Sequence, residues 1–259
     1  MGIATMADSP LILGHRGFSA KYPENTKISF RKAMEGGADG VELDVQLSKD
    51  GVVIVLHDDS VERTTGDGSG SVSELSWRAL RTLNAAYQRP DLAREPIPSL
   101  AEVLDELMDF KGGLCNIEMK PCERWRDLVQ ATLQVVRAHP YTVRYSSFDP
   151  KILGYLKTLE PAAECGLLLT HLDLPEKKAI KTRFGLDLAA IHLFYRNVSF
   201  ELVNQCHQNA MGVAAWTVDH EDDVVRLNQM GVDVIISNHV DETLAALGRL
   251  SGCPRVPKN

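Results

Sequence analysis

The stretch from Gly40 to Asp58, GVELDVQLSKDGVVIVLHD, contains two apolar runs joined by a tight turn at Lys49-Asp50-Gly51. In a β-strand, residues two apart lie on the same face, about 7 Å from each other, so Glu42 and Asp44 share one face. Two acids among buried positions are costly unless something cationic neutralises them. The second run ends in a histidine, His57, which the hairpin returns toward the two acids. The stretch therefore predicts a metal site with a proton donor beside it.

The composition is that of an ordinary globular enzyme-sized protein. The chain has 259 residues, of which 44% are hydrophobic and 24% charged. Its net charge of -7 does not suggest a basic surface for nucleic acid or anionic lipid. No apolar stretch approaches the roughly 18 residues that a membrane helix needs. The first residues, MGIATMADSP, lack the basic and apolar regions of a secretory signal.

The five cysteines form no C-x-x-C pair and are odd in number. They are Cys115, Cys122, Cys165, Cys206 and Cys253. This pattern favours free thiols in a reducing compartment over a zinc site or a disulfide framework. We therefore expect a cytoplasmic protein.

Short apolar runs alternate with helical patterns along most of the chain. Apart from Val52 to His57, which is the hairpin partner, the predicted strands are Leu11 to Gly17, Gly40 to Leu47, Gly113 to Met119, Thr142 to Phe148, Glu164 to Thr170, Ala189 to Tyr195, Gly212 to Val218 and Asp233 to Ser237. The predicted helices are Asn25 to Gly36, Leu100 to Phe110, Arg124 to Ala138, Lys151 to Leu159, Glu176 to Phe184, Phe200 to Asn209, Asp222 to Met230 and Glu242 to Leu250. Near-continuous apolar strands that alternate with helices indicate a parallel sheet covered by helices.

Eight strand–helix units in about 240 residues predict an α/β fold, the (β/α)8 TIM barrel. A doubly wound open sheet is the alternative, and the absence of G-x-G-x-x-G after the first strand disfavours it. The interval from Asp59 to Pro98 is too long for a single crossing, and we interpret it as a short insertion over the barrel mouth that follows the hairpin of the second strand. We expect a flexible lead-in over residues 1–10, one barrel domain over residues 11–250 with the insertion at about 59–98, and a tail over residues 251–259.

Polar residues gather where the predicted strands end, which is where barrel enzymes have their active sites. They are His15, Arg16, Glu42, Asp44, His57, Asn116, Glu118 and Lys120. Three carboxylates without thiolates suit Mg²⁺ or Ca²⁺ better than zinc. The two cations offer fixed positive charge to a phosphate oxygen, and the two histidines suit a general base and a general acid for a phosphoester. Each residue alone has an ordinary structural explanation, so their joint placement is what favours a functional site.

An ordered series of motifs makes the sequence similar to a known family. The motifs are GHRG (Gly14 to Gly17), PENT (Pro23 to Thr26), VELDVQLSKDG (Val41 to Gly51), LHD (Leu56 to Asp58), RTTGDGSG (Arg63 to Gly70), IPSLAEVL (Ile97 to Leu104) and NIEMK (Asn116 to Lys120). Together they resemble the glycerophosphodiester phosphodiesterase family, from about Leu11 to the last predicted strand.

The resemblance implies a metal-dependent barrel enzyme that releases glycerol 3-phosphate and an alcohol from a glycerophosphodiester. It implies the following roles for the residues of this chain: metal ligands Glu42, Asp44 and Glu118; acid/base pair His15 and His57; phosphate contacts Arg16 and Lys120; an accessory role for Glu24 at the metal; and an aromatic wall of Phe148 and Trp216 on the glycerol side. Simple core packing is the alternative for the two aromatic residues, and helix capping is the alternative for Glu24. The route through a cyclic phosphate and direct attack by water both stay open.

The sequence departs from the family pattern in two places. Asp219 stands after Trp-Thr-Val, where the family usually has asparagine. The last predicted strand ends in Ser237-Asn238-His239, where a Thr-Asp-x-Pro run is more usual. Both positions lie outside the inferred metal set, so we expect them to bear on substrate contacts and loop shape more than on the chemistry.

The expected substrates are deacylated phospholipid head groups such as glycerophosphocholine or glycerophosphoethanolamine. A phospholipase D-like or phosphoinositide-cleaving barrel is one alternative, although secretion and disulfides would favour it and neither is indicated. A non-catalytic barrel that only binds a phosphodiester is a second alternative, but no histidine or metal ligand is missing. A divalent-metal aldolase-type barrel is a third, and it would have no special need for two histidines together with two cations.

Overall fold

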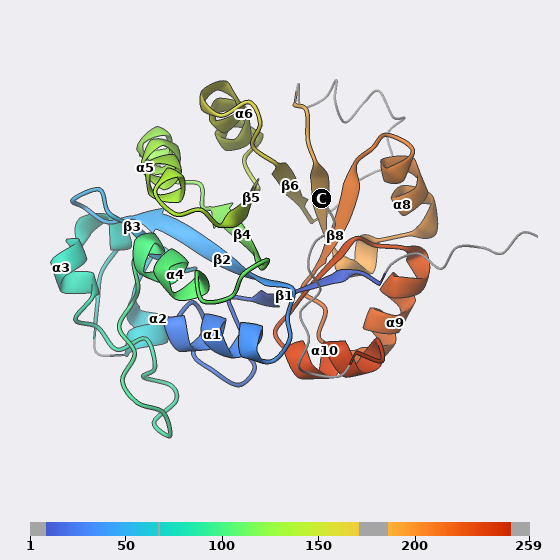
Figure 1. Ribbon diagram of the computed structural model, residues 1–259. Helices are drawn as coiled ribbons and strands as arrows, with labels where there is room; N and C mark the ends of the chain where they lie inside the picture. The colour runs from blue at the N-terminus through green and yellow to red at the C-terminus, as the bar shows by residue number, and fades with distance from the viewer. Residues whose placement is uncertain (1–8, 67, 171–185, 250–259) are drawn as a thin grey trace, which may run out of the picture.

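Eight parallel strands close into a barrel at the centre of the molecule (Figure 1). The computed structural model describes residues 9–66, 68–170 and 186–249. In ring order the strands are β1 (Leu11–His15), β2 (Gly40–Leu47), β4 (Leu114–Met119), β5 (Thr142–Ser147), β6 (Cys165–Leu169), β7 (Ala190–Phe194), β8 (Gly212–Trp216) and β9 (Val234–Ser237). The ring closes because β1 pairs in parallel with both β9 and β2. The predicted (β/α)8 barrel is confirmed, and the open-sheet alternative is wrong.

The hairpin after β2 is shorter than predicted. β3 (Val53–Val55) pairs antiparallel with the C-terminal half of β2, with Val55 opposite Val45. The predicted strand continued to His57, but the Gln46 side chain donates to the carbonyl oxygens of Leu56 and His57 at 2.9 and 3.2 Å. These carbonyls therefore bind a side chain instead of continuing a strand ladder.

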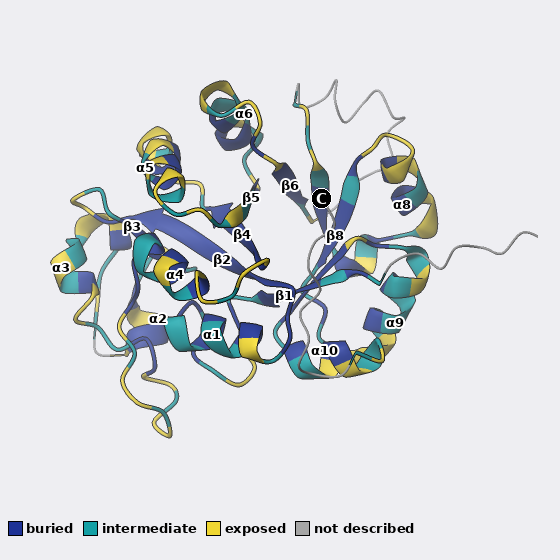
Figure 2. Ribbon diagram, viewed as in Figure 1, coloured by how far each residue is buried: buried dark blue, intermediate teal, exposed yellow. Residues whose placement is uncertain are grey.

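Helices surround the barrel and turn their apolar faces toward it, so that the strands and inner helix faces are buried while the outer faces are exposed (Figure 2). The helices that follow strands are α1 (Lys27–Glu35), α4 (Leu100–Leu107), α5 (Trp125–Arg137), α6 (Pro150–Leu159), α8 (Phe200–His207), α9 (Glu221–Met230) and α10 (Val240–Ala246), with a 3-10 turn η2 (Tyr195–Asn197) before α8. Polar N-caps begin several of them, including Thr26 and Ser99, the second in a full capping box. The helix predicted at Glu176 to Phe184 lies outside the described residues.

The interval from Asp59 to Pro98 contains three short elements: α2 (Glu62–Thr65), η1 (Val72–Glu74) and α3 (Trp77–Leu80). η1 and α3 are separate because Ser76 is the N-cap of α3, and its side chain accepts from the Ala79 backbone N–H. Apolar side chains of the interval form their own buried cluster with β3. Arg89 donates to the Lys21 carbonyl at 2.5 Å, which ties the interval to the β1–α1 loop at the C-terminal end of the barrel.

The apolar residues divide into two sets that leave the C-terminal end of the barrel polar. Outward-facing strand residues such as Val41, Leu43 and Val45 pack against the helices. Inside the barrel, a smaller apolar cluster includes Leu13 and Leu114. The strands β2 and β4 approach closely at Gly40, where a Cβ would lie 2.0 Å from the Leu114 carbonyl oxygen.

Two further sequence-based expectations concern thiols and membranes. The four cysteines within the described residues, Cys115, Cys122, Cys165 and Cys206, are free. Within the same residues, no helix is long and apolar enough to cross a membrane. The domain boundaries, including the lead-in and the tail, stay a prediction.

Candidate active site

Three buried carboxylates meet at the centre of the site. Glu42 and Asp44 lie on the inner face of β2, and Glu118 lies on β4, directly opposite Asp44 in the sheet register. One carboxylate oxygen from each lies within 4.8 Å of the other two, and the three residues are only 4%, 1% and 8% exposed. Hard oxygen donors at this spacing, with no sulfur among them, fit a divalent ion such as Mg²⁺ or Ca²⁺.

The free energy cost of burying these acids is visible in their pKa values. Burial raises the pKa of Glu42 well above its ordinary value, and the neighbouring charges of Asp44 and Glu118 raise it further. Burial also acts to raise the pKa of Asp44, but Lys120 and Arg16 outweigh it and hold that pKa below its ordinary value. Three carboxylates facing two cations leave an excess of negative charge, which is the charge balance expected of a cation site.

The two cations reach the triad from neighbouring loops. Lys120 Nζ lies 2.9 Å from Glu118 Oε1 and 3.2 Å from Asp44 Oδ1. Arg16 Nε lies 3.4 Å from Asp44 Oδ2, and Arg16 Nη1 donates to Glu24 Oε1 at 2.9 Å. Both cations are therefore placed beside the triad, where an anionic ester bound to a metal ion would lie.

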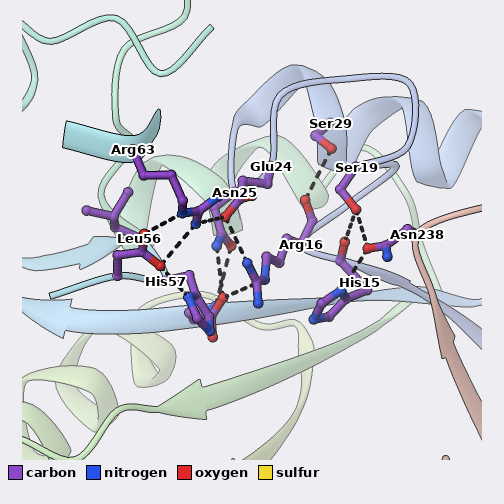
Figure 3. Close-up of polar contacts among 12 residues, drawn as sticks. His15, Arg16, Ser19, Glu24, Asn25, Ser29, Leu56, His57, Arg63 and Asn238 are labelled. Atoms are coloured by element: carbon purple, nitrogen blue, oxygen red, sulfur yellow. Dashed lines mark hydrogen bonds and ion pairs between the residues drawn. The ribbon is translucent and has the colours of Figure 1, made fainter. Parts of the chain in front are cut away.

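The Arg16 backbone is held in a conformation that few residues adopt. Its φ is 55°, in the left-handed region, and the next residue, Gly17, has a φ of 85°. The strained turn is fixed because the Arg16 N–H donates to Glu42 Oε2 at 3.1 Å and the Arg16 carbonyl accepts from Asn25 N at 3.0 Å. The same carbonyl accepts from Ser29 Oγ at 3.2 Å (Figure 3). Strain of this kind is typical of functional loops.

His57 is oriented by the residue that follows it. Its Nδ1 lies 2.6 Å from Asp58 Oδ1, and Asp58 also accepts hydrogen bonds from Arg63. The bond from Arg63 is the main reason that the pKa of Asp58 falls to about 2, so Asp58 is a carboxylate that only accepts. His57 Nδ1 therefore carries the proton, and Nε2 is left for the cavity that His57 lines.

His15 lies on the opposite side of the triad from Lys120, at the end of β1. Its Nε2 is 3.9 Å from Glu42 Oε2, and its Nδ1 is 2.8 Å from Asn238 Oδ1. Burial and the nearby Arg16 charge lower the pKa of His15 to about 4, so the ring is neutral near pH 7. A neutral histidine beside the triad can act as a base.

A cavity of about 180 Å³ connects these groups to an aromatic wall. Its lining includes both histidines, both cations, Phe148 and Trp216. The two rings meet edge to face with centroids 5.6 Å apart, and Phe148 is 40% exposed. Phe148 is thus not an ordinary core residue. A larger cavity of about 310 Å³ extends toward the N-terminal end of the barrel and shares Asn116 and His192 with this one, but it lies away from the triad's charges.

The sequence-predicted residues thus come together, and several partners were missed. Glu24 receives hydrogen bonds from Arg16 and Arg63, so it links the turn to the inserted interval. The missed residues are Asn25, Gln46, Asp58 and Arg63, which contact predicted site residues or their neighbours. Asp219 and Asn238, which the sequence assigned to substrate contacts and loop shape, contact each other, and Asn238 also contacts His15. A signal existed for Asn25, which lies within the PENT motif, and for Gln46, which continues the alternation of Glu42 and Asp44.

The fold and the charge arrangement define a barrel hydrolase for anionic esters. Residues 15–242 match the model of the glycerophosphoryl diester phosphodiesterase family. A glycerophosphodiester phosphodiesterase of Caldanaerobacter subterraneus is 37% identical over 246 residues, which cover 93% of this chain and 99% of the relative. The chain therefore belongs to the glycerophosphoryl diester phosphodiesterase family, and it is an enzyme of this phosphodiesterase class.

Solved structures agree with this assignment. A phosphodiesterase of Oleispira antarctica, described in complex with the product sn-glycerol-3-phosphate, has a TM-score of 0.86 and 27% identity, covering 93% of this chain and 97% of that one. A glycerophosphodiester phosphodiesterase of Thermotoga maritima has a TM-score of 0.72 and 27% identity, covering 91% of this chain and 97% of that one. The recognised resemblance is confirmed.

Proposed function

We propose that this enzyme hydrolyses glycerophosphodiesters to glycerol 3-phosphate and an alcohol, with a divalent metal ion and two histidines as the general acid and base. The preferred substrates in this proposal are deacylated phospholipid head groups such as glycerophosphocholine and glycerophosphoethanolamine. The observation that carries the proposal is the buried triad of Glu42, Asp44 and Glu118, with its oxygens within 4.8 Å of one another, between His15 and His57.

The triad supports a hard divalent ion, Mg²⁺ or Ca²⁺. When bound, such an ion supplies positive charge that neutralises a phosphate oxygen and polarises the phosphorus for attack. The raised pKa of Glu42 reflects its burial and, after that, repulsion by the Asp44 and Glu118 carboxylates, which a cation would relieve. Arg16 and Lys120 carry fixed positive charge at the same place and are the proposed phosphate contacts.

The two histidines support proton transfer at opposite sides of the phosphate. Asp58 fixes the proton of His57 on Nδ1, which leaves Nε2 in the cavity. His15 Nε2 lies on the Glu42 side of the same cavity. One imidazole would remove a proton from the attacking oxygen and the other would protonate the leaving alkoxide. The attacking oxygen is either a glycerol hydroxyl, which gives a cyclic phosphate that water opens, or water itself.

Phe148 and Trp216 support recognition of the glycerol moiety. Their rings pack against each other and line the same cavity as the charged groups, so they offer an apolar surface to the carbon skeleton of a substrate whose phosphate meets those groups. The Oleispira antarctica relative is described with the product sn-glycerol-3-phosphate, which agrees with a glycerol side in this cavity. The free cysteines of the described residues agree with a reducing compartment, and we propose a cytoplasmic location.

The test is release of glycerol 3-phosphate by metal-stripped protein, before and after addition of Mg²⁺ or Ca²⁺. Substrates are glycerophosphocholine, glycerophosphoethanolamine and glycerophosphoinositol. We expect release only after metal is added, and the two ions are ranked by their rates. Release from none of the three substrates with either ion would overturn the substrate proposal and point to a different phosphodiester.

A further inference from the structure

Asp219 and Asn238 form a hydrogen-bonded chain that ends on His15. Asp219 follows β8 and Asn238 follows β9, so both lie at the C-terminal end of the barrel, where β9 stands between β8 and β1. Asn238 Nδ2 donates to Asp219 Oδ2 at 2.7 Å, and the Asn238 backbone N–H donates to Asp219 Oδ1 at 2.9 Å. Asn238 Oδ1 then lies 2.8 Å from His15 Nδ1 (Figure 3). One carboxylate thus holds Asn238 at two points while Asn238 contacts the histidine.

The direction of both side-chain hydrogen bonds, between Asp219 and Asn238 and between Asn238 and His15, follows from the Asp219 carboxylate. A carboxylate only accepts, so the Asn238 atom facing Asp219 is the amide nitrogen and the atom facing His15 is the oxygen. An amide oxygen also only accepts, so His15 Nδ1 must carry the proton. A neutral imidazole has a single N–H, and Nε2 therefore has the lone pair. That nitrogen lies on the Glu42 side, 3.9 Å from Glu42 Oε2.

Ser19 also contacts the Asn238 side chain. Its Oγ lies 2.6 Å from Asn238 Oδ1 and 2.7 Å from the His15 carbonyl oxygen, and its single proton can be donated to one of these two acceptors at a time, so the carboxylate of Asp219 is what sets the orientation of the amide (Figure 3). A flipped Asn238 amide would turn its N–H groups toward His15 Nδ1 and lose the bond to the carboxylate. The proton would then be driven to Nε2.

We propose that Asp219 and Asn238 are positioning residues that hold His15 as the Nδ1–H tautomer, with Nε2 open to the substrate. The tautomer is a property of the protein itself, while its importance for turnover rests on the proposed function of His15. These are also the two positions at which the sequence departs from its family pattern, with a carboxylate in place of the usual amide and an amide in place of the usual carboxylate. In this chain the two residues present one donor facing one acceptor.

The exchange suggests a matched set of variants. In Asp219→Asn, an amide faces Asn238 and no longer dictates which way the Asn238 amide points. In the double variant D219N/N238D, a carboxylate faces His15 Nδ1 and an amide stands behind it, so Nδ1 remains the proton donor. The control is Asp233→Asn, because Asp233 Oδ2 accepts from His207 Nε2 at 2.9 Å on the exposed surface, away from the site.

We expect kcat of Asp219→Asn to fall roughly 10- to 100-fold with little change in KM, as for other groups that orient a reacting side chain. The double variant should recover most of the lost kcat, and Asp233→Asn should keep the original value. Equal melting temperatures among the variants would exclude unfolding as the cause. An Asp219→Asn enzyme with the original kcat, or a folded double variant that recovers nothing, would overturn the positioning role.

Nuclear magnetic resonance on the metal-free protein tests the tautomer without any turnover. In protein with ¹⁵N-labelled histidine, correlations between ring protons and ring nitrogens distinguish protonated from unprotonated nitrogen, and His15→Gln identifies the His15 signals. We expect Nδ1–H in the original protein and the double variant, and loss of the single tautomer in Asp219→Asn. A proton on His15 Nε2 in the original protein would overturn the inference even if the enzyme is active. Inactive original protein with the Nδ1–H tautomer would instead count against the proposed function alone.

Discussion

Asn25 donates its side-chain amide to Asp44 Oδ2 at 2.9 Å, and Asn25 Oδ1 accepts from the Asp44 backbone N–H at 3.4 Å. This two-way contact joins the β1–α1 loop to the strand that carries two of the triad carboxylates. Asn25 is 2% exposed and has a left-handed backbone with a φ of 56°. Asparagine tolerates this conformation better than most residues. Its side-chain amide orients the Asp44 carboxylate toward the other two acids of the triad.

Asn25→Gly should therefore weaken metal binding while keeping the fold. Glycine adopts a positive φ freely, so the loop is preserved and only the amide contact is lost. We expect the affinity for Mg²⁺ to fall roughly 10- to 100-fold, measured by titration calorimetry on metal-stripped protein. Ala210→Gly is the control, because Ala210 also has a positive φ of 53° but lies on an exposed loop. Equal affinities for the two variants would contradict the role of Asn25.

The residues that the sequence could predict are those whose position follows from local pattern. Period-two alternation placed Glu42 and Asp44 on one face, and barrel geometry placed the strand ends together. Part of what it missed depends on contacts between distant segments. Asn238 and His15 are 223 residues apart and meet only because β9 pairs with β1 when the barrel closes. No local pattern in the chain records that pairing.

Element boundaries show the same limit. The hairpin strand was predicted to reach His57 because Leu56 continues its apolar run, but β3 ends at Val55. The side chain of Gln46 binds the carbonyls that a longer strand would have used. Apolar character identified the buried residues correctly, while a side-chain hydrogen bond decided where the strand ends.

His57→Ala should abolish turnover and leave metal binding largely intact. Loss of a general acid or base slows the chemical step by roughly 10²- to 10⁴-fold, and His57 contributes no oxygen to the triad. Glu42→Ala and Asp44→Ala should lose both turnover and metal binding because they remove proposed metal ligands. Glycerol 3-phosphate release and calorimetric titration with Mg²⁺ separate the two effects. Near-normal turnover by His57→Ala would show that the acid/base assignment is wrong.

Lys120→Met should destabilise the metal-free protein more than the metal-bound protein. The Lys120 ammonium contacts two buried carboxylates, and removing one partner of a buried ion pair typically costs about 3 kcal/mol. A bound divalent ion replaces part of the lost positive charge, so added Mg²⁺ should narrow the difference in free energy of unfolding, measured in urea. Lys32→Met, which removes an exposed pair with Glu35, should change little with or without metal. A Lys120→Met protein as stable as the original without metal would rule out this charge balance.

His192 should make the protein lose stability as the pH falls from about 6.5 to about 4. Burial and the Arg144 charge lower the pKa of His192 from 6.5 to about 4, so the unfolded chain takes up a proton over this range while the folded protein does not. The shift corresponds to about 3 kcal/mol of unfolding free energy, fully lost near pH 4 and with no further loss below it. The glutamine of His192→Gln takes up no proton in either state. The unfolding free energy of this variant, measured in urea, should therefore fall less steeply with pH than that of the original protein across this window. Parallel pH profiles for the two proteins would mean that His192 takes up its proton over this pH range in the folded protein as well. The barrel interior around His192 would then be more polar than the burial of its side chain implies.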